Sequence, residues 1–350
     1  MNATTVAVDL AKSVFQVAEA DARGHITGSH RLTRTQFERF FANREVGQVV
    51  MEACGSAHHW GRSLQRQGVA VRLLPAAHVQ RFCLRNKTDA ADCMALLRAN
   101  GDPKIREVRV KSIEQQALQA LHRTRSQWMA TRVQRINALR GFCREFGLPV
   151  AVGARTGLHA ISRLVADPAS CLPALLRPAM AMLLDEIAQL HLRIAQLERE
   201  LALVARQSPA CQLLLSIPGV GLLTCTALVA AIGTDVSHFR NGRQLAAWLG
   251  LTPWEHSSGQ TRRLGAITRA GDRYLRTLLT HGARSVLQAA SRAQNAGRTC
   301  TGLRAWVLAV RQRTNQNKAT CALANKLARI CFATLRSGQP FDESRACRAR

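Results

Sequence analysis

Four acidic residues stand at positions where a metal-dependent reaction could use them. Asp9 and Glu52 each end a short apolar stretch rich in β-branched residues, and Asp89 and Asp92 are three residues apart. That spacing puts the latter pair on one face of a helix. Strand ends and neighbouring helix ends converge at one edge of an open sheet, where four carboxylates would repel one another unless a cation joined them. Carboxylate oxygens suit a pair of Mg²⁺ ions, with Mn²⁺ as a substitute.

The alternative for each acid, taken singly, is a helix cap or a surface charge. Asp9 is the hardest to explain in that way, because a carboxylate at the end of a buried strand is costly without a partner. Lys87, just before the second acidic pair, is expected to contact nucleic acid.

A second candidate is Ser257-Ser258-Gly259, a serine and glycine loop that precedes a run of arginines. One of the serines could attack a phosphorus while the arginines balance the developing charge. On these residues alone, a phosphate-binding loop whose serine only donates a hydrogen bond is the stronger interpretation. The arginines expected to contact nucleic acid are Arg262, Arg263, Arg269, Arg273 and Arg276.

A third candidate is the segment SIPGVG (216–221), which precedes an apolar helix. Such a turn exposes backbone N–H groups to an anion, as in the phosphate contacts of helix-hairpin-helix motifs, with Gly219 and Gly221 at the contact. The alternative is an ordinary glycine turn between packed helices. The basic context favours nucleic-acid binding.

The composition supports a polyanionic partner. Lys and Arg together number 49 against 22 acids, for a net charge of +27, and most of the excess lies after residue 205. Arginine suits phosphate because its planar fork binds two oxygens. The 11 cysteines contain no CxxC pair, which indicates reduced thiols, and His58-His59 lacks partners at zinc spacing. Without an apolar run of about 18 residues or a signal pattern, a cytoplasmic protein with no membrane partner is expected.

These residues need elements to position them. In 1–108 the pattern predicts three meandering strands followed by βα units, which form a mixed sheet covered by helices. The expected strands are 5–9, 15–21, 25–32, 48–53 and 69–75, and the expected helices are 35–44, 57–67, 76–83 and 88–99.

Residues 109–205 are expected to form a middle segment of long helices. One helix should span 109–147, with a connector over 148–178. The apolar positions that follow step alternately by three and four, which favours a coiled coil, either between chains or as a hairpin. A helix packed on its neighbour within one chain is the alternative. The apolar positions are Met180, Leu183, Ile187, Leu190, Ile194, Leu197, Leu201 and Val204.

Residues 206–350 are expected to form a mainly helical, basic C-terminal domain. Its predicted helices lie near 210–216, 222–232, 241–249, 270–290, 301–312 and 318–336.

Five segments in this order resemble the DEDD transposases of bacterial insertion sequences, a family that includes pilin-gene invertases and bridge-RNA-guided recombinases. The resemblance covers about residues 5–335, and its KTDxxD and SSG…RLG blocks are specific. Cys93 departs from the small residue usual after the second aspartate. The segments are VAVDLAKSVFQV, VVMEACGSAHHW, NKTDAADCMALL, SIPGVG and LGLTPWEHSSGQTRRLGAITRAGDRYLR.

The resemblance implies a RuvC-like, RNase H-type first domain in which Asp9, Glu52, Asp89 and Asp92 bind metal, and a C-terminal transposase domain with a serine nucleophile. Ser258, next to glycine, is the preferred nucleophile and Ser257 is the alternative. The family resemblance further implies a phosphoserine link to DNA at the element ends and target. A dimer or tetramer joined by the coiled coil, with an active site composed from two protomers, and a structured guide RNA are also expected.

Two other functions are compatible with these residues. A Holliday-junction-type nuclease would use the four acids and water, without a serine. A non-enzymatic nucleic-acid-binding protein would need neither acids nor metal. An actin-like phosphotransferase is disfavoured, because the chain lacks a second glycine-rich phosphate strand.

Overall fold

The computed structural model describes residues 4–42, 44–83 and 88–346, and it divides into two compact units. The first unit ends at Ile113 and the second begins at Glu114. In the described part of the chain, no helix has both the length and the apolar character needed to cross a membrane.

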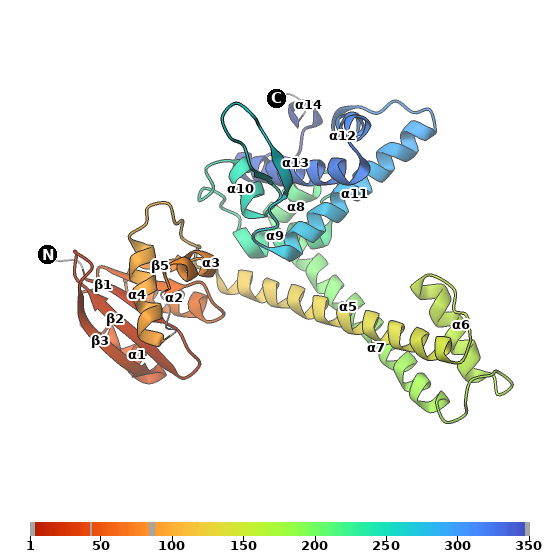
Figure 1. Ribbon diagram of the computed structural model, residues 1–350, viewed down its shortest axis with the longest axis horizontal. Coiled ribbons are helices and arrows are strands. Elements are labelled where there is room, and N and C mark those ends of the chain that lie inside the picture. The colour runs from red at the N-terminus through yellow and green to blue at the C-terminus, as the bar shows by residue number, and fades with distance from the viewer. Residues whose placement is uncertain (1–3, 43, 84–87, 347–350) are drawn as a thin grey trace. The chain divides into compact units, whose positions relative to one another are not determined.

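The first unit is built on a five-stranded mixed sheet with the spatial order β3-β2-β1-β4-β5 (Figure 1). β1 pairs antiparallel with β2 and parallel with β4; β2 pairs antiparallel with β3, and β4 parallel with β5. The expected order of three meandering strands followed by βα units is confirmed. The strands are β1 (Thr5–Asp9), β2 (Val14–Ala20), β3 (Ile26–Thr33), β4 (Gln48–Glu52) and β5 (Val71–Leu74).

Helices cover both faces of this sheet, because neighbouring residues of a strand point to opposite sides. On the first face, Val8, Phe15 and Met51 pack in one core with side chains of α1 (Arg34–Phe40) and α2 (Ala57–Arg66). On the second face, Ala7 and Val50 pack with buried residues of α4 (Asp89–Asn100). Between β5 and α4 lie α3 (Ala76–Val79) and a 3₁₀ turn, η1 (Gln80–Phe82).

In the second unit, α5 (Ile113–Glu145) and α7 (Arg177–Gln207) form an antiparallel pair (Figure 1). Two ion pairs, Arg125–Glu198 and Arg135–Glu186, show the antiparallel direction. From the first pair to the second, the residue number rises along α5 and falls along α7. The expected seam of α7 is largely buried within the chain: Met180, Ile187, Leu190, Ile194, Leu197 and Leu201 are buried, whereas Val204 is exposed. Its partners include residues of α5, α6 (Ala154–Ala166) and α9 (Leu222–Ile232).

The C-terminal helices share one large core. They are α8 (Pro209–Leu215), α9, α10 (Gly242–Trp248), α11 (Arg273–Asn295), α12 (Gly302–Arg313) and α13 (Gln316–Ser337), followed by α14 (Glu343–Ala346). A two-stranded antiparallel hairpin of β6 (Pro253–Glu255) and β7 (Leu264–Ile267) precedes α11.

Two local elements differ from the sequence-based expectation. Residues 148–178 were expected to be a connector, yet they contain α6. Gly157 occurs within this helix because a Cβ there would lie 2.8 Å from the Arg140 guanidinium and 3.1 Å from the Ala151 carbonyl oxygen. The hairpin of β6 and β7 was not expected from the sequence either.

Candidate active site

Asp9 and Glu52 end neighbouring parallel strands. Val8 is paired with Met51 in the register, so the two acids are the next residues on each strand. Each follows a buried residue by one position and is itself partly exposed. Because side chains alternate, Asp9 lies on the same face as Ala7, and Glu52 on the same face as Val50. That is the face that α4 covers.

The second acidic pair lies in the first turn of α4. The side chain of Thr88 caps this helix by accepting a hydrogen bond of 3.2 Å from the Ala91 backbone N–H. Acidic side chains are favourable in a first turn because the helix dipole is positive there. The cap at Thr88 therefore starts the helix at the first of the two acids. Asp89 is exposed and Asp92 is partly buried.

Cys93 anchors this turn of α4 to the sheet. Its Sγ donates toward the Gln16 carbonyl oxygen at 3.3 Å and lies 3.9 Å from that of Ala7. Burial, together with the nearby charges of Asp9, Asp92 and Asp89, raises the pKa of the Cys93 thiol to about 12. Three of the four acids therefore act electrostatically on one buried atom, and Cys93 stays a neutral thiol among them.

The four acids share one face and one edge, but they are not drawn into a tight cluster. Among the residues described, no group of three or more His, Cys, Asp or Glu side chains is arranged to hold one metal ion. The donor set, four carboxylates beside partly exposed strand ends, fits Mg²⁺ in chemical type.

The serine loop is the tip of the β6–β7 hairpin. Ser258 and Thr261 exchange backbone hydrogen bonds of 3.2 and 3.1 Å, with Gly259 at φ 56° in the turn between them. Ser257 Oγ donates a hydrogen bond of 2.9 Å to Glu255 Oε1 and accepts one of 3.1 Å from the Arg263 backbone N–H. Both serines are exposed.

The five candidate arginines have different surroundings. Arg262, Arg263 and Arg273 are exposed, and Arg262 Nε lies 3.4 Å from Glu255 Oε1. Arg276 donates to the carbonyl oxygens of Leu249 and Ala270 and so helps to hold the hairpin base.

Arg269 has a backbone φ of 56°, a left-handed conformation that is uncommon for a residue with a side chain. Its N–H donates to the Gly250 carbonyl oxygen at 3.1 Å, next to the base of the hairpin.

The glycines of the PGVG turn have different roles in packing. Gly219 has φ 86°, and a Cβ there would lie 2.9 Å from the Gly282 carbonyl oxygen, so the turn packs directly on the backbone of α11. Gly221 precedes α9 and has open space at its Cβ position. A cavity of about 560 Å³ adjoins the turn and is lined by residues of both segments, including His281 and Ser285.

Lys87 lies outside the described residues. Sequence reasoning missed Glu255, the hydrogen-bond partner of Ser257, although its position two residues before the first serine was a usable signal. Among the described cysteines none forms a disulfide; five are buried, whereas Cys83 and Cys171 are exposed.

Known transposases are similar to this chain over most of its length. A transposase family model matches residues 6–146, and the model of the transposase IS116/IS110/IS902 family matches residues 211–297. A probable family 20 transposase of Pseudomonas aeruginosa is 41% identical over 337 residues, 96% of this chain and 97% of that protein. The transposase for insertion sequence element IS1111A of Coxiella burnetii is 37% identical over 328 residues, which are 94% of this chain and 88% of that protein. A pilin gene-inverting protein of Moraxella bovis is 31% identical over 45% of this chain and 46% of its own length.

The mixed sheet of the first unit and the matches to both family models define the chain as a DEDD transposase. The chain belongs to the IS110/IS116 family of such transposases. Membership implies DNA as the substrate, a DNA-cleaving activity and a general dependence on divalent metal.

Proposed function

We propose that this transposase cuts and rejoins DNA strands of an insertion sequence through a covalent phosphoserine intermediate. The observation that carries the proposal is the common placement of the four acids: two on adjacent parallel strand ends, and two on the first turn of the helix that covers the same face. An arrangement of this kind is difficult to explain as four unrelated surface charges.

Asp9, Glu52, Asp89 and Asp92 would hold the metal, with Mg²⁺ as the proposed ion and two ions as the proposed number. When bound, divalent cations lower the cost of negative charge that develops on the phosphate oxygens. Cys93 supports the site from beneath, because its neutral thiol occupies the small space between α4 and the sheet without adding a fifth negative charge.

Ser258 is the proposed nucleophile. Its Oγ forms a bond to phosphorus as the hydroxyl proton leaves, and the phosphodiester bond breaks so that one DNA end departs as a hydroxyl. The phosphate ester on serine conserves the energy of the broken bond, so a second DNA hydroxyl can reverse the step without ATP. Ser257 is already engaged with Glu255 and Arg263, which supports a role in holding the hairpin tip.

The basic side chains of the hairpin and of α11 supply charge for DNA binding in this proposal. Exposed Arg262, Arg263 and Arg273 can reach phosphate, whereas Arg276 is occupied with backbone carbonyls and supports the loop from within. Gly221 is the better candidate of the two turn glycines for a backbone contact, since nothing fills the space beside it.

A structured guide RNA and a homo-oligomer are further parts of the proposal. The net charge of +27 exceeds what a short DNA contact alone requires and suits an additional polyanion. Because the α7 seam is mostly buried within the chain, a contact between copies through α7 would use its exposed residues, such as Met182 and Leu192. Sequencing RNA that remains bound to purified protein tests the first point, and light scattering tests the second.

The competing function is a metal-dependent junction nuclease that uses water as its nucleophile. A DNA strand-joining assay with Mg²⁺ separates the two mechanisms, using wild type, Asp9→Ala, Ser257→Ala and Ser258→Ala. The proposal predicts joined strands with wild type and none with Asp9→Ala or Ser258→Ala. Full joining by both serine variants would exclude a covalent serine intermediate.

A further inference from the structure

A row of paired residues extends from the acidic site toward the edge of the first-unit sheet. Asp9 on β1 is paired with Gln16 on β2, which is paired with Arg31 on β3. Paired residues of neighbouring antiparallel strands lie on the same face. Gln16 and Arg31 therefore share the face of Asp9, and so does Ser29, which is paired with Ala18.

The outer part of this row faces solvent. α4 packs over Ala7, Ala18 and Val50 on this face, but Ser29 and Arg31 on β3 are exposed. The backbone of Arg31 pairs with β2, but its side chain makes no hydrogen bond or ion pair with another residue that the structure describes. Its guanidinium keeps five N–H donors available for an anion.

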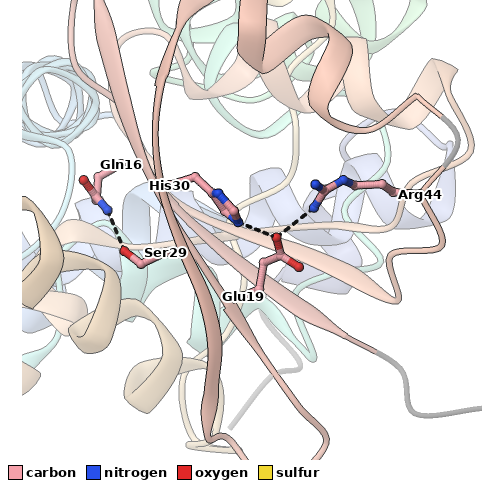
Figure 2. Close-up of polar contacts among 5 residues, drawn as sticks. All are labelled: Gln16, Glu19, Ser29, His30 and Arg44. Carbon is pink, nitrogen blue, oxygen red and sulfur yellow. Dashed lines mark hydrogen bonds and ion pairs between the residues drawn. The ribbon is translucent and has the colours of Figure 1, made fainter.

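Gln16 orients the hydroxyl of Ser29. The Gln16 Nε2 donates a hydrogen bond of 3.0 Å to Ser29 Oγ, as Figure 2 shows. Since a hydroxyl has one donor and can accept at its lone pairs, the Ser29 O–H remains able to donate outward. The row thus presents one oriented hydroxyl donor and one free cation.

The opposite face of the same strands differs in character. There Glu19 accepts hydrogen bonds from His30 Nε2 at 2.9 Å and from Arg44 Nη1 at 2.8 Å (Figure 2). The Arg44 guanidinium also lies over the Phe40 ring at 4.1 Å. On that face the Arg44 guanidinium is neutralised and fixed, whereas on the face with the acids the Arg31 guanidinium makes no hydrogen bond or ion pair with a residue that the structure describes.

We propose that Ser29 and Arg31, with Gln16 as the positioning residue, bind the phosphodiester backbone of the DNA strand that the acids act on. This inference rests on the proposed function, because it assumes that the acids are the cleavage site. An exposed charge is common on an edge strand, but alignment in register with Asp9 assigns this one to the substrate path. β3 is two strand spacings from β1, about 10 Å, so the contacted phosphate should lie within about three nucleotides of the cleaved bond.

Binding measurements on the full chain test the contact separately from catalysis. Each variant is made in an Asp9→Asn background, and its affinity for a fluorescent DNA carrying the element end is measured over a series of KCl concentrations. Arg31→Ala should weaken binding about tenfold and lower the salt slope by about one, as expected for loss of one phosphate contact. Arg31→Lys should restore the salt slope.

Arg39→Ala is the matched control. Arg39 is also an exposed arginine of the same unit, but it lies on α1, which packs on the opposite face of the sheet. The Arg39→Ala substitution removes the same charge and should leave the DNA affinity and its salt slope unchanged. Equal losses of DNA affinity for Arg31→Ala and Arg39→Ala would show that only the overall charge matters and would overturn the proposal. The same titration with an RNA of equal length is a second control, and an Arg31→Ala effect on RNA affinity alone would also overturn the proposal.

Cross-linking locates the contact. A photoreactive benzoylphenylalanine in place of Ser29 should cross-link to DNA within about three nucleotides of the cut mapped with wild-type protein, whereas the same group in place of Arg39 should not. Cross-links far from the cut would overturn the inference while leaving cleavage by the acids intact. If wild type cuts no DNA, the proposed function fails, and the binding comparison still decides whether Arg31 contacts a phosphate backbone.

Discussion

Ser257 Oγ lies 2.9 Å from Glu255 Oε1, and this hydrogen bond ties the start of the hairpin tip to strand β6. The same oxygen accepts the Arg263 N–H from the other side of the hairpin. Ser257 thereby joins both sides of the loop and leaves its neighbour Ser258 at the turn. The geometry divides the two serines into a positioning residue and the proposed nucleophile.

Substitutions at the hairpin tip should show this division. Ser257→Ala removes two hydrogen bonds of about 1 kcal/mol each, so the rate of DNA–protein adduct formation should fall by up to about 30-fold without vanishing. Glu255→Gln keeps an acceptor for the serine and should have a smaller effect. Ser258→Ala should form no adduct, measured by gel shift of labelled DNA under denaturing conditions. The reverse pattern would make Ser257 the nucleophile.

The glycines where the PGVG turn packs on α11 should differ in their tolerance of substitution. Gly282→Ala places a Cβ against the Gly219 carbonyl oxygen and should cost about 3 kcal/mol or more in free energy of unfolding. Gly221→Ala meets open space and should change that free energy by no more than about 0.5 kcal/mol. Gly221→Ala should nevertheless weaken DNA binding if the backbone N–H groups of the turn contact phosphate. Unchanged affinity would limit the turn to packing.

The buried seam of α7 and its outer face should respond differently. Ile187 is 2% exposed, and Ile187→Ala should lower the free energy of unfolding by about 2–5 kcal/mol. Met182 is 68% exposed, so Met182→Asp should leave urea unfolding nearly unchanged and reduce the oligomeric mass in light scattering. If Ile187→Ala dissociates an oligomer without lowering stability, the seam joins chains rather than helices of one chain.

Acid should destabilise the second unit through His122. This buried ring is hydrogen-bonded to Tyr274 Oη at 3.1 Å and Thr226 Oγ1 at 3.0 Å. Burial, followed by the charge of Arg125, lowers the pKa of His122 from 6.5 to about 4. Between these values the unfolded chain binds a proton that the folded chain does not, so stability falls as pH falls.

The expected loss is about 2 kcal/mol between pH 6.5 and about pH 5, at about 1.4 kcal/mol per pH unit. Urea unfolding at both pH values measures it, and His122→Gln should be less stable at neutral pH but less sensitive to acid. An equal pH dependence in the variant and the wild type would contradict the assignment.

The sheet and most helices were predictable because their patterns are local. The apolar stretch that ends at Asp9 and the capped helix that begins at Asp89 carry their own signals of strand and helix. The helix 222–232 was predicted with its observed bounds, since glycines stand at both of its ends.

Features that depend on distant packing were less predictable. Gly157 suggested a break, but its small size serves the close approach of Arg140 and Ala151 to α6. The heptad pattern identified the buried side of α7 without saying which helix covers it. Similarly, the bond between Ser257 and Glu255 depends on a hairpin whose strands are exposed and lack an alternating apolar signal.

Mass spectrometry of the trapped DNA adduct tests the central claim most directly. Wild-type protein is incubated with element-end DNA and Mg²⁺, the adduct is digested with trypsin and nuclease, and the nucleotide-bearing peptide is fragmented. The account predicts a nucleotide phosphate on Ser258, absent when Asp9→Ala is used. Cut DNA with unmodified Ser257 and Ser258 would show that water is the nucleophile and would contradict the account.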